Sequence, residues 1–64
     1  MSEESETAAR YRSRAEALHT IASSTKDPSQ QYVLRELAKD YERLGITLEA
    51  IDRSKQVLAR FGKP

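Results

Sequence analysis

The sequence predicts an all-α fold: an antiparallel helical hairpin with a long second helix. Three observations indicate it. Apolar residues recur at spacings of three and four in two segments, a turn signal separates those segments, and no stretch alternates apolar and polar residues as a strand does. A chain of 64 residues forms one domain. We expect a single helical domain over residues 7–61, between a disordered tail at residues 1–6 and a C-terminal tail at residues 62–64.

The first helix is predicted over about residues 6–24. After Met1, the residues before it are polar and acidic. From there the apolar residues follow the alternating three- and four-residue spacing of a packed helix. This first seam consists of Ala8, Tyr11, Ala15, Leu18 and Ala22, and Ile21 widens it.

Asp27 and Pro28 mark the turn and the start of the second helix. The Asp27 carboxylate can accept a hydrogen bond from a free amide in the first turn of that helix. Pro28 suits the first helical position, where its missing N–H costs nothing. Gln30 stands three residues after Asp27, as in a capping box. The second helix is therefore expected to begin at Pro28.

The second helix carries a longer seam with the same spacing, and Gly62 suits its end. The seam consists of Leu34, Leu37, Tyr41, Leu44, Leu48, Ile51, Lys55 and Leu58. A short turn folds this seam back on the first one, which predicts four facing pairs: Leu18 with Leu34, Ala15 with Leu37, Tyr11 with Tyr41, and Ala8 with Leu44. The two tyrosines are expected to pack edge to face.

Gly45 allows two interpretations of this second segment. We favour one continuous helix, because the heptad spacing crosses Gly45 undisturbed, although an interior glycine costs about 1 kcal/mol relative to alanine. In the alternative, a three-helix bundle, Gly45 ends one helix in a left-handed conformation. Thr47 then caps a third helix, with Ile46 and Ile51 as a hydrophobic staple.

The composition excludes most catalytic chemistry. Cysteine is absent, His19 is the only histidine, and the formal net charge is +1. Acidic and basic residues alternate at helical spacing, which is typical of intrahelical pairs on solvated faces. We therefore expect no enzyme activity, no catalytic residue, no cofactor, no metal and no small-molecule substrate. No apolar run approaches a membrane span and no leader opens the chain, so we expect a cytoplasmic protein without a membrane partner.

Residues 44–47 resemble the turn of helix-turn-helix proteins, with glycine at the turn and β-branched residues after it. The alternative function is therefore a small DNA-binding regulator that uses residues 36–60. Tyr41, however, stands where that motif needs a small residue, and Glu49 and Asp52 lie in the would-be recognition helix. A net charge of +1 also offers few phosphate contacts. Nucleic acid is not the partner that we expect.

A family resemblance rests on three segments: Tyr11-Arg12-x-Arg14-Ala15-Glu16-x-Leu18, Lys26-Asp27-Pro28, and Leu37-Ala38-Lys39-Asp40-Tyr41-Glu42-Arg43-Leu44. Together they resemble a group of small uncharacterised helical-hairpin proteins from bacteria, especially the rhizobia and their relatives. The resemblance covers residues 11–44 and implies a cytosolic two-helix protein of unknown function, with no active site to carry over. This sequence departs from the group at Gly45, where alanine is expected.

The function that these patterns favour is a non-enzymatic interaction module that associates with itself or docks on a partner helix. The second helix is longer than the first, so the apolar residues of its C-terminal part have no partners within the chain. We therefore expect a coiled-coil-like homodimer, an antiparallel four-helix assembly. Ile21 and Ala22 of the first helix and Val33 of the second should face the partner. The predicted interface residues are Leu37, Leu44, Leu48, Ile51, Val57, Leu58 and Phe61.

Overall fold

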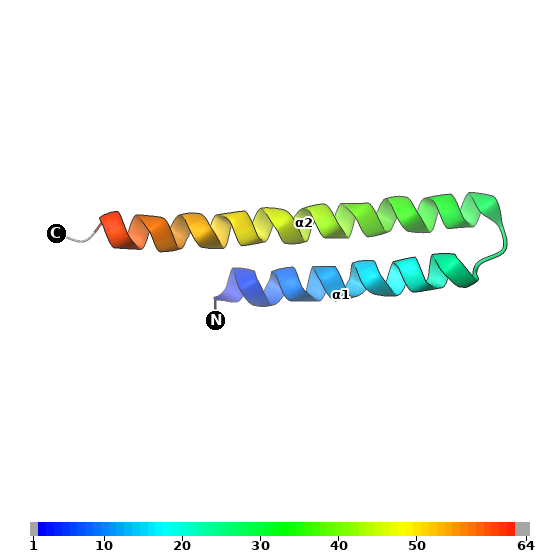
Figure 1. Cartoon of the computed structure of the whole chain (residues 1–64), viewed down its shortest axis with the longest axis horizontal. Helices are drawn as coiled ribbons and strands as arrows, with labels where there is room; N and C mark the ends of the chain where they lie inside the picture. Colours follow the sequence, from blue (N-terminus) through cyan, green and yellow to red (C-terminus); the bar gives the residue numbers. More distant parts are fainter. Residues whose placement is uncertain (1, 63–64) are drawn as a thin grey trace.

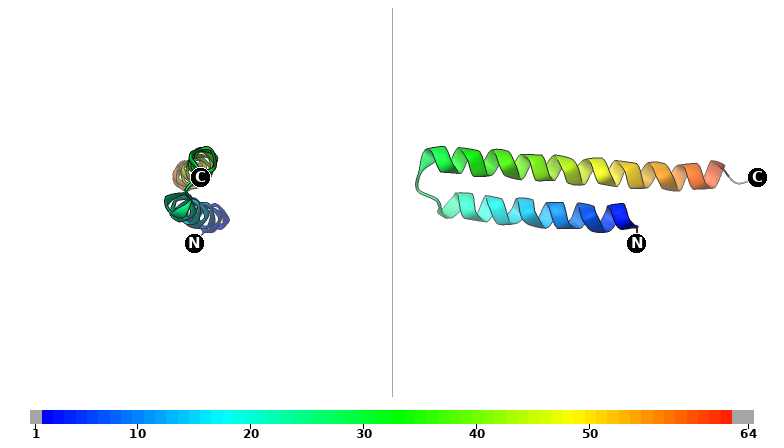
Figure 2. Two further views of the ribbon diagram at one scale, coloured as in Figure 1. Left: turned by 90° about the vertical axis from the view of Figure 1, so that its right-hand side faces the viewer. Right: turned by 180° about the vertical axis from the view of Figure 1, so that it is seen from behind.

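The protein is a hairpin of two antiparallel helices, α1 (Glu3–Ser24) and α2 (Pro28–Phe61), joined by a short turn (Figure 1). The computed structural model describes residues 2–62, and the predicted tail positions 1, 63 and 64 lie outside them. The helices lie side by side, and α2 extends beyond the N-terminal end of α1 (Figures 1 and 2). The molecule measures 59 × 16 × 10 Å. The predicted hairpin with a long second helix is confirmed.

α1 begins at Glu3, three residues earlier than predicted. Ser2 caps it, because the Ser2 hydroxyl accepts a hydrogen bond of 3.0 Å from the Ser5 amide. The first turn carries Glu3, Glu4 and Glu6, whose negative charges suit the positive end of the helix dipole. Residues 3–6 are therefore helical, and the expected disordered tail does not extend over them.

The start of α2 follows the prediction. The Asp27 carboxylate accepts a hydrogen bond of 2.9 Å from the Ser29 amide, and Pro28 is the first helical residue. The capping box expected at Gln30 is not seen among the hydrogen bonds of residues 2–62. Instead, the Gln31 side chain donates to the Thr25 carbonyl and ties the new helix to the turn.

Removing the Asp27 cap should destabilise the hairpin by about 1 kcal/mol. Asp27→Ala leaves the Ser29 amide without its side-chain acceptor, so we expect a lower midpoint in thermal or urea unfolding. Asp27→Asn is the matched control, because asparagine retains the acceptor and caps as well as aspartate. An Asp27→Ala variant as stable as the parent would contradict the cap.

α2 passes through Gly45 without a break, and no described residue has a positive φ. The favoured continuous helix is therefore confirmed, and the three-helix alternative does not form. Gly45 is buried against α1, where a Cβ atom would lie 3.4 Å from the Ala8 carbonyl oxygen. Glycine at this position lets the two backbones approach closely.

Small residues form the interior between the helices. Every seventh residue of α1 is a buried alanine, at Ala8, Ala15 and Ala22, and Ala38 and Gly45 face them from α2. No large side chain among the described residues is fully buried. The hairpin interior is therefore held by close backbone approach rather than by interlocking large side chains.

The predicted pairing is right in one layer and wrong by one residue in two others. Tyr11 and Tyr41 lie together with ring centroids 5.6 Å apart, stacked at 30° rather than edge to face. Leu37 and Leu44, however, do not occupy the interior positions opposite Ala15 and Ala8. Those positions belong to the next residues along α2, Ala38 and Gly45, because only small side chains fit where the backbones are closest.

Candidate functional site: an exposed apolar stripe

Large apolar side chains follow α2 along a line that α1 leaves uncovered. Four of them recur at every seventh position, and one more stands near each end of the line. Their exposed fractions range from 41% for Leu37 to 83% for Phe61. We call this surface the outer stripe; it consists of Val33, Leu37, Leu44, Ile51, Leu58 and Phe61. Aligned exposure of this kind on a small protein typically marks an interaction surface.

The same face continues onto α1 near the turn. Ile21 is 50% exposed there, and Leu18 is half-buried beside it. The Arg14 guanidinium lies over the Tyr41 ring, 5.9 Å from its centroid. Around these side chains is a shallow hollow of about 240 Å³, lined by Arg14, Ala17, Leu18, Ile21, Leu37 and Tyr41.

A second hollow lies on α2 close to the turn. It has a volume of about 330 Å³ and is lined by Ser29, Gln30, Val33 and Leu34. Val33 belongs to the outer stripe, so this hollow extends the apolar face to the turn end of the hairpin. Apolar surface is thus available along the whole length of α2.

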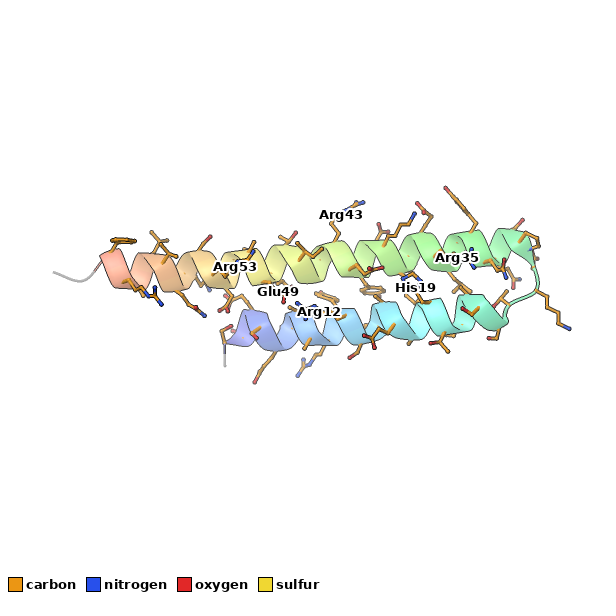
Figure 3. The ribbon with its side chains drawn as sticks, in the orientation of Figure 1. Arg12, His19, Arg35, Arg43, Glu49 and Arg53 are labelled. Atoms are coloured by element: carbon orange, nitrogen blue, oxygen red, sulfur yellow. The ribbon has the colours of Figure 1, made fainter. Side chains whose placement is uncertain are left out.

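The opposite flank of the hairpin is charged and internally paired. Arg12 of α1 forms an ion pair with Glu49 of α2, and Figure 3 shows the two side chains between the helices. One heptad away on each helix, His19 Nε2 lies 2.9 Å from a carboxylate oxygen of Glu42. We call these four residues the ionic flank. His19 is exposed here, in a contact between the helices.

Glu4 and Lys55 form a third contact between the helices. Their hydrogen bond lowers the pKa of the Glu4 carboxyl and raises the pKa of the Lys55 ammonium. The Lys55 side chain is 62% exposed although that of Glu4 is only 19% exposed, so water screens the pair and its contribution to stability is small. Its consequence is geometric, since the Lys55 ammonium is held toward α1.

Charged residues were expected to pair within each helix, and the structure bears this out only in part. Glu36 and Lys39 do form such a pair, at 3.1 Å. Arg12 and Glu49 pair across the hairpin instead. The sequence signal for the ionic flank is the matched heptad spacing of Arg12 with His19 and of Glu42 with Glu49.

Most predicted interface residues are exposed, with two exceptions. Leu48 is half-buried against α1, and Ala22 is fully buried inside the hairpin because it continues the alanine heptad. Val57 is 48% exposed and borders a shallow groove beside Leu58. Tyr32 and Ile46 are also exposed, though they lie off the outer stripe.

The described residues offer little for other kinds of site. Within residues 2–62, no group of three His, Asp or Glu side chains could hold a metal ion. No helix in that part of the chain combines the length and the apolar character needed to cross a bilayer. The outer stripe is therefore the surface on which a functional interpretation rests.

Fold and surface together define a two-helix hairpin with an alanine and glycine interior and a leucine-rich outer face. No protein-family model, curated protein or solved structure matches this chain significantly. The resemblance to small bacterial helical-hairpin proteins therefore stays a prediction from the sequence.

Proposed function

We propose that this protein is a non-enzymatic helical interaction module that self-associates through the outer stripe as an antiparallel four-helix homodimer. One observation carries the proposal. The fully buried positions between α1 and α2 hold only alanine and glycine, whereas the isoleucines, the phenylalanine and three of the leucines, Leu37, Leu44 and Leu58, are exposed. The arrangement of apolar residues is that of half a helical bundle.

The energetics favour a second layer of helices. A large apolar side chain contributes about 1.5–3 kcal/mol when fully buried, and the hairpin alone realises only part of that contribution for the outer stripe, whose side chains stay 41% to 83% exposed. The chain has no cysteine and no described metal site that could staple so small a domain. Association with another chain supplies the missing burial.

A second copy fits the outer stripe better than a different partner does. A two-fold axis brings identical stripes together, so each chain covers the surface that the other exposes. The ionic flank is already paired within the chain, so these four residues do not select an oppositely charged partner. The formal net charge of +1 also keeps the repulsion between two copies small.

The alternative of a DNA-binding regulator loses its structural basis. A helix-turn-helix over residues 36–60 needs a turn at Gly45, and α2 is continuous there. Glu49 of the would-be recognition helix is paired with Arg12, so its carboxylate would stand near any phosphate that approached this arginine.

Sedimentation equilibrium tests the proposal. We expect a mass of twice the 7.3 kDa of the chain at micromolar concentration. The melting temperature should rise with protein concentration, because folding and association are coupled. A mass of 7.3 kDa across the micromolar range, with a melt independent of concentration, would overturn self-association.

A further inference from the structure

The predicted seam of α2 is divided by the structure into two parallel rows. Leu34, Tyr41 and Leu48 are half-buried along the edge of α1. Leu37, Leu44, Ile51 and Leu58 stand one step further round the helix and are more exposed. From Leu34 to Leu58 the steps of three and four residues alternate, and their order is the same when the seam is followed from either end.

We infer that, if the chain self-associates as proposed above, two copies of α2 pair antiparallel in one defined register. In this register the half-buried residues Leu34, Tyr41 and Leu48 each meet a residue of the more exposed row in the other copy. The layers are Leu34 with the partner's Leu58, Leu37 with the partner's Lys55, Tyr41 with the partner's Ile51, and Leu44 with the partner's Leu48.

This register is selected because it uses every position of the seam. A shift by one heptad in one direction leaves Lys55 and Leu58 without a partner layer. A shift in the other direction leaves Leu34 and Leu37 without one. A parallel, in-register pair is disfavoured by charge, because it would place Lys55 against its own copy.

The residues beside the seam agree with the same register. On one side of the seam, Ala38 and Gly45 are buried against α1 and are not available to the partner. On the other side, Val33 lies next to the partner's Phe61, Asp40 next to the partner's Ser54, and Thr47 next to its own copy at the two-fold axis. The pairs are apolar with apolar or polar with polar, and no like charges meet.

Antiparallel pairing also covers the part of α2 that extends beyond α1. That end would lie beside the turn end of the other hairpin, where Val33 and Leu34 line the hollow of about 330 Å³. Phe61, which is 83% exposed, is the side chain placed to enter it. The Lys55 ammonium is held toward Glu4 of its own chain. The aliphatic stem of Lys55 is therefore free to pack against the partner's Leu37.

Cysteine cross-linking tests the register cleanly, because the chain has no cysteine of its own. Thr47→Cys, oxidised with copper phenanthroline, should give a disulfide-linked dimer on a non-reducing gel, since the two thiols face each other at the axis. Ile46→Cys is the matched control. Ile46 is the adjacent residue, is also exposed, and lies four residues after Glu42 on the side of the ionic flank, so its thiols should not meet.

Val33→Cys and Phe61→Cys distinguish the orientation. Each variant alone should stay uncross-linked, because the two copies of Val33 would lie roughly 42 Å apart at ~1.5 Å of helix per residue. A mixture of the two variants should cross-link. Val33→Cys linking to itself as readily as Thr47→Cys would overturn the antiparallel register.

Sedimentation of the reduced variants separates the two proposals. A dimer whose Thr47→Cys variant does not cross-link would overturn the register and leave self-association standing. A reduced protein of 7.3 kDa throughout would overturn both.

Discussion

Leu44→Glu should break the proposed homodimer. Leu44 is 46% exposed in the hairpin and lies at the middle of the outer stripe, so the change removes one apolar side chain from each copy and places two carboxylates in the interface. Because Leu44 is already about half-buried in the hairpin, each copy loses only about half of the 1.5–3 kcal/mol of full burial, which raises the dissociation constant by a factor of about 10 to 10² before the cost of burying the carboxylates is added. Sedimentation velocity across a concentration series measures this factor.

Ile46→Glu is the control for that experiment. Ile46 is 63% exposed in the same stretch of α2 and lies off the outer stripe. The substitution adds the same charge and removes a similar apolar side chain, yet it should leave the dissociation constant unchanged. Equal weakening by both substitutions would show that general loss of apolar surface, rather than the outer stripe, governs association.

Gly45→Leu should destabilise the hairpin by about 1–3 kcal/mol, as overpacking of a close contact does. The first side-chain atom would already lie 3.4 Å from the Ala8 carbonyl oxygen and 3.5 Å from Cγ of Arg12. The rest of a leucine side chain has no space there unless α1 and α2 move apart. Urea unfolding, compared at fixed protein concentration, measures the loss of stability.

Gly45→Ala should have the opposite sign. Its Cβ atom makes an ordinary van der Waals contact with α1, and the interior glycine penalty of about 1 kcal/mol is removed, so the variant should gain up to that amount. The pair of variants thus separates helix propensity from helix spacing. A destabilised Gly45→Ala variant would show that the helices are packed too closely even for a methyl group.

The hairpin itself could be predicted from local patterns. Asp27 and Pro28 start α2 because capping and proline geometry act within one turn of helix. Continuity through Gly45 followed from a heptad spacing that the glycine does not disturb. The early start of α1 at Glu3 was missed, although Ser2 followed by Glu3 and Glu4 is a local capping signal that the sequence displays.

The assignment of residues to the two faces of α2 could not be predicted in the same way. Leu37 and Ala38 are neighbours, as are Leu44 and Gly45, and the spacing suits either member as the one that faces α1. The sequence by itself determined two helices, their turn and an apolar band along α2. Only the tertiary structure decided that Ala38 and Gly45 face α1 and that Leu37 and Leu44 face outward, because the distance between the two backbones selects the smaller side chain.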